Sequence, residues 1–260
     1  DIISGMKCVI LAGGRGTRLS EETNLLPKPM IEIGGKPIIW HIMKHYSVYN
    51  IKEFVICAGY KSNVIKNYFI NYNANNSSLH IDLKNNSTTF ESQHNEDWKI
   101  SIIDTGLETN TAGRLKLIQD YITEDSFLMT YGDGIGNVDI NALTDFHNSH
   151  GKLVTLTATI PEGRFGAINI QDNIVKTIKE KLDTADKFIN GGFFVIQKDA
   201  LEYIENLDQQ WEMEPLSAIA AKGELMAFKH RGFWKAMDHL RDKIQLDELA
   251  NLEKPPWKTW

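Results

Sequence analysis

Short apolar runs rich in β-branched residues alternate with helical patterns along the first 150 residues of this chain. The strand-like runs are KCVILAG (7–13), EFVICAGY (53–60), WKISIIDT (98–105) and SFLMTYGDG (126–134). Patterns typical of helices follow them at 37–50, 62–72, 113–122 and 139–150. This β-α-β-α order predicts an α/β fold, Rossmann-like, with a mixed, mostly parallel central sheet flanked by helices.

The pattern changes from Gly151 onward, where strands follow one another closely. We expect strands at 153–160, 166–170, 173–180 and 191–197, and helices at 199–207, 214–223 and 239–252. No internal repeat and no long linker divides the chain, which predicts a single domain over 6–260.

Two segments stand apart from this pattern. Residues 1–5 precede Met6 without a basic start or an apolar core, so they do not resemble a signal peptide and could be an expression remnant. Residues 71–98 are rich in Asn and Ser and form a polar insertion. A segment of this kind is either a plain surface excursion, or a lid or oligomer contact.

Composition excludes several classes of function. The 260 residues carry a formal net charge of −6 and no basic block, which argues against nucleic acid or an anionic membrane as a partner. No apolar run is long enough for a membrane span. Cys8 and Cys57 both lie in apolar strands, which indicates buried, reduced thiols rather than a disulfide or metal cluster. All of this fits a cytoplasmic protein.

The first strand runs into a glycine-rich loop, LAGGRGTR, at residues 11–18. A dinucleotide fingerprint would require glycine at Leu19, and a Walker loop would require a lysine and a hydroxyl residue after its last glycine. Neither pattern is present. Glycines still let backbone N–H groups approach an anion, and Arg15 and Arg18 supply forked donors for phosphate oxygens. Lys28, held between Pro27 and Pro29, adds a point charge, so together they predict a phosphate-binding loop rather than a plain turn.

A triphosphate site also needs a metal, and two aspartates could hold it. Asp133 lies between two glycines at the end of an apolar strand, and Asp238 follows GFWKAM before a helix. Each also has a plainer interpretation, Asp133 as a turn residue and Asp238 as a helix N-cap. In open parallel sheets, however, ligands bind beyond the carboxyl ends of the strands, where Mg²⁺ takes one or two carboxylates plus phosphates.

The stretch from MKCVILAGGRGTRLSEET to PKPMIEIGGKPIIWHIMKHY resembles the opening of the sugar-nucleotide pyrophosphorylases. The likeness covers Met6 to Trp260 and continues through DTGLETNTAGRLK, TYGDG, NGGFFV, WEMEPL, GFWKAMDHLRDK and PPWKTW. These later motifs are most similar to the cytidylyltransferase branch of the family. The resemblance implies the family's nucleotidyltransferase fold.

The resemblance also implies a set of site residues. The nucleotide and its triphosphate would be bound by Leu11, Ala12, Gly13, Gly14, Arg15, Gly16, Thr17, Arg18, Lys28, Thr109 and Arg114. The sugar phosphate would be bound by Lys181, Gly191 and Gly192, and Mg²⁺ by Asp133 and Asp238. Catalysis would rest on Arg15, Lys28 and Lys181, which neutralise charge and position the two anions.

The implied reaction joins CTP and glucose 1-phosphate to give CDP-glucose and pyrophosphate, for nucleotide-sugar and surface polysaccharide (lipopolysaccharide) biosynthesis. A homo-oligomer is implied as well, with a hexamer as one candidate. Two positions depart from the family pattern: Leu182 replaces a proline and His239 replaces a threonine. Both concern the acceptor, so a CTP-dependent transferase with a different phosphorylated acceptor is the alternative. A sugar-nucleotide sensor without turnover and a hydride-transfer enzyme are less favoured, because Lys28, Asp133 and Asp238 are present and Leu19 is not glycine.

Other polar and aromatic residues have ordinary structural interpretations. We expect His41 and His45 to be packing or surface residues of a helix, and His147 and His150 to interact with a helix dipole. Glu212 and Glu214 precede a helix, where acids are common. The tail PPWKTW carries two tryptophans, which we expect to dock against the body or a neighbouring subunit.

Overall fold

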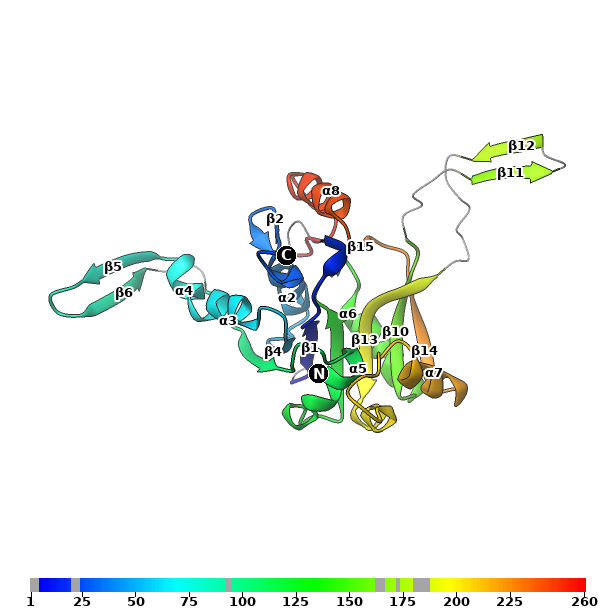
Figure 1. Cartoon of the computed structure of the whole chain (residues 1–260), viewed down its shortest axis with the longest axis horizontal. Coiled ribbons are helices and arrows are strands. Elements are labelled where there is room, and N and C mark those ends of the chain that lie inside the picture. Colours follow the sequence, from blue (N-terminus) through cyan, green and yellow to red (C-terminus); the bar gives the residue numbers. More distant parts are fainter. Residues whose placement is uncertain (1–4, 20–23, 92–94, 162–166, 172–173, 180–187) are drawn as a thin grey trace.

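The computed structural model describes residues 5–19, 24–91, 95–161 and 188–260, and the backbone alone at 167–171 and 174–179. A seven-stranded sheet forms its centre, in the order β14-β10-β13-β8-β1-β4-β7 (Figure 1). Its strands are β1 (Lys7–Ala12), β4 (Glu53–Ala58), β7 (Lys99–Asp104), β8 (Ser126–Tyr131), β10 (Val154–Thr159), β13 (Ile189–Gln197) and β14 (Leu225–His230). Only β13 runs antiparallel to its two neighbours, so the predicted mixed, mostly parallel sheet is confirmed.

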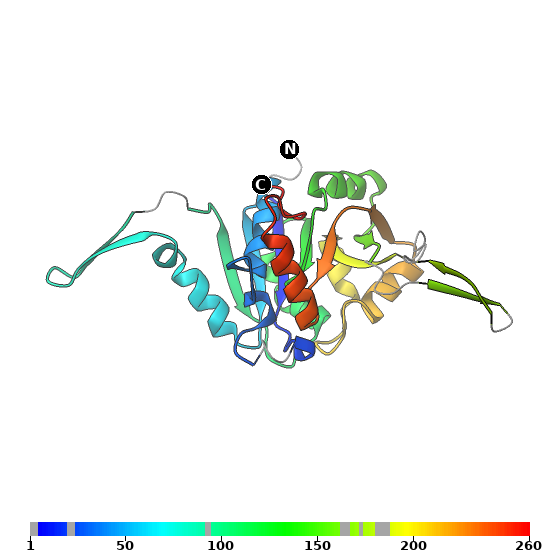
Figure 2. The same ribbon diagram turned by 90° about the horizontal axis from the view of Figure 1, so that it is seen from above.

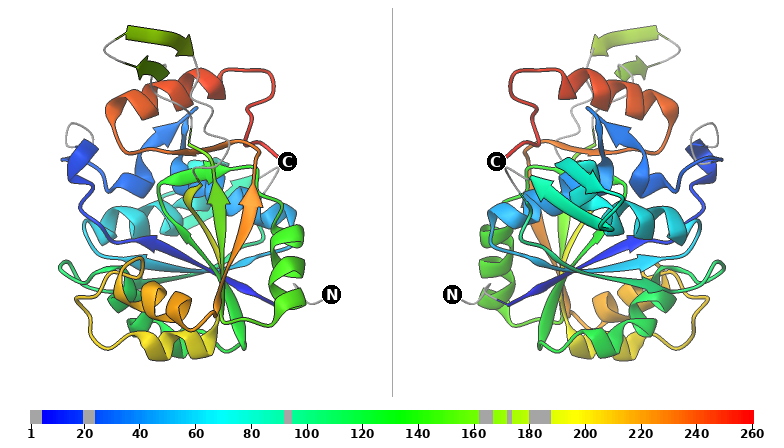
Figure 3. Two further views of the ribbon diagram at one scale, coloured as in Figure 1. Left: turned by 90° about the vertical axis from the view of Figure 1, so that its right-hand side faces the viewer. Right: turned by 90° about the vertical axis from the view of Figure 1, so that its left-hand side faces the viewer.

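Both faces of the sheet are covered, which explains the continuous apolar runs of its strands. In β1, Cys8 and Ile10 face one side and Val9 faces the other, and all three are fully buried. The first face packs against α2 (Ile38–Val48), α3 (Ser62–Ile70) and α6 (Ile140–His150). The second packs against α5 (Thr111–Leu117), the 3₁₀ helix η4 (Lys198–Tyr203) and α7 (Glu214–Ala221). Figure 3 shows these two helical layers on either side of the fanned strands.

Three small hairpins and one further antiparallel strand pair complete the described fold. The hairpin of β2 (Glu32–Ile33) and β3 (Lys36–Pro37) lies beside α8 (Leu240–Ala250), and β9 (Gly134–Gly136) pairs with β15 (Trp234–Ala236). Two hairpins project from opposite ends of the molecule (Figures 1 and 2). One consists of β11 (Ala167–Gln171) and β12 (Ile174–Lys179), and the other of β5 (Ser78–Asp82) and β6 (Ser87–Glu91).

The β5–β6 hairpin, which we call the arm, occupies the polar insertion at 71–98, after the short helix α4 (Tyr72–Asn75). Apolar residues alternate with polar ones from Leu79 to Leu83, a strand signal that the abundance of Asn and Ser obscures. The turn is built by Asp82, whose carboxylate accepts hydrogen bonds from the backbone N–H groups of Lys84 and Asn85 at 3.0 and 3.1 Å. The insertion is therefore a folded arm that extends away from the sheet (Figure 2).

Two predicted helices are shorter than the sequence pattern indicates. The segment 199–207 forms only the 3₁₀ helix η4, which ends with an i→i+3 bond from the Ile204 N–H to the Leu201 carbonyl. The segment 113–122 divides into α5 and the 3₁₀ helix η3 (Gln119–Tyr121). Apolar spacing cannot distinguish these forms over one or two turns, because residues three apart lie on one side of either helix.

The C-terminal tail docks against the body of the molecule. Trp257 is buried, with its ring centroid 5.9 Å from that of His41 and 5.8 Å from that of Phe233. Trp260 lies edge-on to Trp40, at 5.9 Å between centroids. The tail was expected to dock either against the body or against a neighbouring subunit, and the structure shows it docked against the body. His41 takes part in this packing and is itself buried.

Other buried polar groups have structural roles. Cys8 and Cys57 are free and buried, as predicted. The dipole interpretation is wrong for His147, because burial lowers its pKa to about 4 and the neutral ring bonds Thr155 Oγ1 at 2.8 Å.

Within the described residues, every helix is too short or too polar to cross a bilayer.

The buried His45 makes the stability of the fold depend on pH. Its Nε2 lies 2.9 Å from the Val138 carbonyl, and its Nδ1 lies 3.1 Å from the Thr259 hydroxyl. Burial lowers the pKa of His45 to about 4, below the ordinary value of about 6.5. Below pH 6.5 the unfolded chain therefore gains a proton that the folded protein does not take up, so stability falls as the pH falls toward 4.

We expect His45→Gln to reduce this dependence, because glutamine does not titrate in this pH range. Its side-chain amide can still donate to the Val138 carbonyl, so the packing of the helix should be kept. Between about pH 7 and pH 5, the wild-type free energy of unfolding should lose about 2 kcal/mol through this one group. Urea denaturation at both pH values measures the loss. Equal losses in the wild type and the variant would contradict this assignment.

Candidate active site

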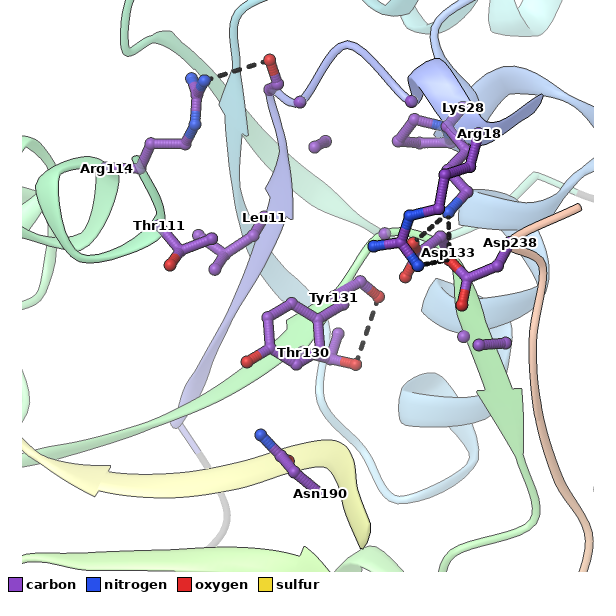
Figure 4. A pocket seen from close by; sticks show the side chains of 18 of the residues that line it. Leu11, Arg18, Lys28, Thr111, Arg114, Thr130, Tyr131, Asp133, Asn190 and Asp238 are labelled. Atoms are coloured by element: carbon purple, nitrogen blue, oxygen red, sulfur yellow. Dashed lines mark hydrogen bonds and ion pairs between the residues drawn. The ribbon is translucent and has the colours of Figure 1, made fainter. Parts of the chain in front are cut away.

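A pocket of about 600 Å³ opens at the carboxyl ends of β1 and β8, where the antiparallel β13 begins. Among the predicted site residues, it is lined by Leu11, Ala12, Gly13, Gly14, Gly16, Thr17, Arg18, Lys28, Thr109, Arg114, Asp133, Gly191 and Asp238. Figure 4 shows that Arg114 and the charged group of Arg18, Lys28, Asp133 and Asp238 lie at different ends of the pocket. The pocket therefore has Arg114, which we call the clamp, at one end. Asp133 and Asp238, which we call the acidic pair, lie at the other end.

Asp133 and Asp238 are brought together by the pairing of β9 with β15. In this antiparallel pair Gly134 lies opposite Ala236, and the Met237 N–H donates to the Asp133 carbonyl at 2.8 Å. The ladder therefore places the residue before β9 next to the residues after β15. The N-cap interpretation of Asp238 is wrong, because the N-cap of α8 is His239. Asp242 satisfies this end of the helix, accepting from the N–H groups of Asp238 and His239.

Lys28 lies between the two aspartates. Its Nζ donates to Asp133 Oδ2 at 2.7 Å and to Asp238 Oδ1 at 2.8 Å. The lysine begins a 3₁₀ turn, Lys28–Met30, and Pro29 packs so closely on Gly132 that a Cβ there would lie 2.9 Å from the proline ring. The proline-bounded turn thus fixes the backbone from which the Lys28 side chain extends toward the two aspartates.

At the end of the pocket that holds Lys28 and the acidic pair, ion pairing outweighs burial in setting the direction of the pKa shifts. Burial alone would lower the pKa of Lys28, but the adjacent Asp133 and Asp238 outweigh it and raise the pKa. Burial would raise the pKa of Asp238, whereas its contacts with Lys28 and the nearby Arg18 lower it. Arg18 Nη1 lies 3.9 Å from Asp238 Oδ1, and its side chain is 72% exposed. Lys28 therefore forms close ion pairs with both aspartates, and Arg18 forms a longer, exposed one with Asp238.

The acidic pair fits a divalent cation. One carboxylate oxygen of each aspartate lies within hydrogen-bond distance of the same nitrogen, so the two oxygens already converge on one cation. Hard oxygen donors of this kind suit Mg²⁺. The described residues contain no cluster of three or more His, Cys, Asp or Glu side chains that could hold a metal.

Arg114 joins three loops at the other end of the pocket. Its guanidinium donates to the Gly106 carbonyl at 2.8 Å, to Thr105 Oγ1 at 2.7 Å and to the Gly13 carbonyl at 3.1 Å. These acceptors follow β7 and β1, and the Ala58 carbonyl at the end of β4 lies 3.4 Å away. Burial lowers the pKa of Arg114, and the side chain is only 4% exposed. Arg114 thus bonds neutral oxygens and organises the loops at this end of the pocket.

This clamp explains one of the loop glycines. A Cβ on Gly13 would lie 2.1 Å from the guanidinium of Arg114, and one on Gly59 would lie 2.6 Å from it. The absence of a side chain at Gly13 therefore admits Arg114, a reason that the sequence pattern does not reveal. Gly14 has open space around its Cβ position, and Gly16 adopts a φ of +61°. These two glycines keep the loop backbone accessible from the pocket.

Among the described residues, two predicted site residues, Arg15 and Gly192, do not line the pocket, and a third lies outside the described part of the chain. Lys181, with the neighbouring Leu182, lies outside the described residues. Arg15 forms an exposed ion pair with Glu108. Gly192 is placed beneath the ring of Tyr131, where a Cβ would come within 2.4 Å, and its φ is +77°. Gly192 therefore has a packing role, and its contact with the sugar stays a prediction.

A polar group that the sequence analysis interprets as ordinary is connected to the pocket. Glu212 accepts hydrogen bonds from the Tyr131 hydroxyl and, at 2.8 Å, from Thr111 Oγ1. Both donors line the pocket, so Glu212 is not merely an acid near a helix start. Burial and Glu212 raise the pKa of Tyr131, which keeps its hydroxyl protonated. The signal for Tyr131 was its position in TYGDG, two residues before Asp133.

The comparisons with known proteins agree with this geometry. The family model described as "Nucleotidyl transferase" matches residues 7–235, and the chain belongs to that family. It is 53% identical over 256 residues to a glucose-1-phosphate cytidylyltransferase of Salmonella typhi, and 52% identical to one of Salmonella typhimurium; each match covers 98% of this chain and 100% of the relative. The crystal structure of HddC from Yersinia pseudotuberculosis has the same fold, with a TM-score of 0.67 and 22% identity, covering 94% of this chain and 98% of that one. The family predicted from the sequence is therefore confirmed.

We expect Arg114→Met to destabilise the fold and to weaken nucleotide binding together. The variant leaves the Gly13 and Gly106 carbonyls without their donor, so the free energy of unfolding should fall by about 3 kcal/mol. Chemical denaturation and nucleotide titration measure the two effects. Lys116→Met, on the same helix, is the matched control. If Arg114→Met matches that control in both measurements, the clamp does not hold the loops.

Proposed function

We propose that this protein transfers a cytidylyl group from CTP to glucose 1-phosphate, giving CDP-glucose and pyrophosphate. The observation that carries the proposal is the convergence of Lys28, Asp133 and Asp238 at one end of a pocket that also contains the glycine-rich loop. The full-length similarity to glucose-1-phosphate cytidylyltransferases supports the choice of both substrates. The product is an activated sugar for nucleotide-sugar and surface polysaccharide synthesis.

The nucleotide occupies the pocket between the clamp and the acidic pair. The base and ribose lie toward Thr109 and Arg114, and the triphosphate extends along Gly14 to Arg18 toward Lys28. Loop N–H groups and the exposed guanidinium of Arg18 meet phosphate oxygens there. Arg15 leaves its exposed pair with Glu108 to join them, because such surface pairs contribute little stability.

The chemistry is one phosphoryl substitution. An oxygen of the sugar phosphate forms a bond to the α-phosphorus of CTP, and the bond from that phosphorus to the β-phosphate oxygen breaks as pyrophosphate leaves. The attacking oxygen is already anionic at neutral pH, so no general base is needed. The work of the protein is to align two anions and to offset their charge, which Lys28, Arg18 and the loop N–H groups do.

Enzymes of this family use a divalent metal ion, and we propose Mg²⁺ for this chain. Asp133 and Asp238 would hold it, with phosphate oxygens completing its coordination. When bound, the ion supplies positive charge to the reacting phosphate oxygens. The role of the two carboxylates is to place this charge at the end of the pocket opposite the clamp.

The acceptor enters from the side of β13 and β15. Gly191 lies there, with its carbonyl bonded by the indole N–H of Trp234 at 2.7 Å. We propose Lys181 as a ligand of the sugar phosphate on the basis of the sequence resemblance alone. A second cavity of about 380 Å³ adjoins Asp238 and is lined by Lys235, His239 and Arg241, among others. His239, which departs from the family pattern, lies in this cavity. We therefore retain the alternative function, in which CTP reacts with a different phosphorylated acceptor.

The partner in solution is a second copy of the chain, and the arm is its contact. Leu79 and Phe90 lie opposite each other on one face of the hairpin, and Ile81 follows Leu79 on that face. Their exposed fractions are 40%, 52% and 60%. A two-stranded hairpin with an uncovered apolar face is marginal alone and gains stability by association. A hexamer is one assembly that such arms could form. We place the protein in the cytoplasm, where its free thiols stay reduced.

The proposed reaction is tested by measuring pyrophosphate release from each common nucleoside triphosphate with glucose, galactose and mannose 1-phosphates. CTP with glucose 1-phosphate should be fastest. Asp133→Asn should lower that rate on the order of 10²–10³-fold without changing the thermal melt. A preference for another nucleotide would exclude the proposal, whereas CTP with another acceptor would establish the alternative.

We expect Ile81→Asp to break the assembly, because it places a charge on the apolar face of the arm. Light scattering during size-exclusion chromatography should show a multimer for the wild type and a smaller species for the variant. Thr89→Asp, on the opposite face of the hairpin, is the control and should keep the wild-type mass. A monomeric wild type, or equal masses for both variants, would contradict the role of the arm.

A further inference from the structure

The ammonium of Lys28 occupies the position that serves a divalent cation in the proposed function. It lies 2.7 Å from Asp133 Oδ2 and 2.8 Å from Asp238 Oδ1, and its side chain is only 12% exposed. Mg²⁺ bonds its oxygen ligands at about 2.0–2.1 Å. An ion held by the same two oxygens would therefore overlap the ammonium, so the two cations exclude each other.

Lys28 can leave this position without disturbing the fold. Only its long side chain needs to rotate, because the backbone is held by Pro27, Pro29 and the packing of Pro29 on Gly132. Lys28 lines the same pocket as Gly14, Gly16 and Arg18, where the triphosphate is proposed to lie. A bound triphosphate would give the ammonium new anionic partners within the reach of its side chain.

We propose that Lys28 couples metal binding to nucleotide binding by exchanging partners. Without nucleotide, Lys28 acts as the resident cation of the acidic pair and competes with the metal. When the triphosphate binds, it attracts the ammonium away, and the carboxylates become available. The inference rests on the proposed function, since it requires Asp133 and Asp238 to be the metal ligands.

The coupling is reciprocal, as for any pair of linked binding equilibria. Nucleotide should tighten metal binding by the same factor by which metal tightens nucleotide binding. Removing the ammonium ends the competition, so metal should bind the free variant more tightly than the free wild type. The exchange replaces two charge-assisted hydrogen bonds, so the expected gain is on the order of tenfold. A lysine that served only to bind phosphates would leave metal binding to the free protein unchanged.

The test measures Mn²⁺ binding by electron paramagnetic resonance, with and without a CTP analogue whose α,β-bridge is methylene, so that no turnover occurs. The proteins are the wild type, Lys28→Met and Lys28→Gln. Both variants should bind Mn²⁺ about tenfold more tightly than the wild type without the analogue. The analogue should tighten Mn²⁺ binding by a larger factor in the wild type than in either variant. Circular dichroism verifies folding, and the second variant keeps the test valid if the first misfolds.

Two controls separate the coupling from the metal site itself. Lys99→Met removes a lysine from an exposed ion pair with Glu53 and should bind Mn²⁺ like the wild type. Asp133→Asn should lose the Mn²⁺ site. If Asp133→Asn loses the site but the Lys28 variants bind Mn²⁺ no more tightly than the wild type, the coupling is wrong and the metal site stands. If Asp133→Asn binds Mn²⁺ normally, both the metal site and the coupling are wrong.

Discussion

One ion-pair cluster closes one end of the pocket. Lys28 bonds Asp133 and Asp238, which lie 105 and 210 positions away in the sequence. Two carboxylates this close repel each other strongly unless a cation lies between them. The β9–β15 ladder fixes the aspartate backbones, and the proline-bounded turn fixes the lysine backbone. In this structure the ammonium of Lys28 provides the cation that this end of the pocket needs.

The opposite end of the pocket follows a different electrostatic principle. All of the described hydrogen bonds of Arg114 go to neutral oxygens, three of them backbone carbonyls. None of these described acceptors is a carboxylate, so the guanidinium contributes a positive potential at its end of the pocket. Gly13 and Gly59 are the residues that admit it. The packing of Arg114 thus determines where the glycine-rich loop must lack side chains.

The sequence predicted the sheet because its strands are buried on both faces and read as apolar runs. It also indicated most of the pocket, since a glycine-rich loop and an aspartate at strand ends must meet at one edge of a parallel sheet. It failed where the deciding contact is distant. The packing of Gly192 beneath Tyr131 has no signal in the sequence, and Glu212 bonds Tyr131 and Thr111 rather than acting at its own helix. The arm was missed as a hairpin because its many Asn and Ser residues concealed the alternation.

By itself, then, the sequence determined the class of fold, the open glycine-rich loop at the end of the first strand and the identity of the acidic residues, because these follow from local pattern and side-chain chemistry. The tertiary structure decided which groups share a hydrogen bond. Lys28 faces two aspartates and Arg114 faces three loops only because separate strands end at the same edge. Such partnerships depend on distances across the fold, which no spacing along the chain encodes.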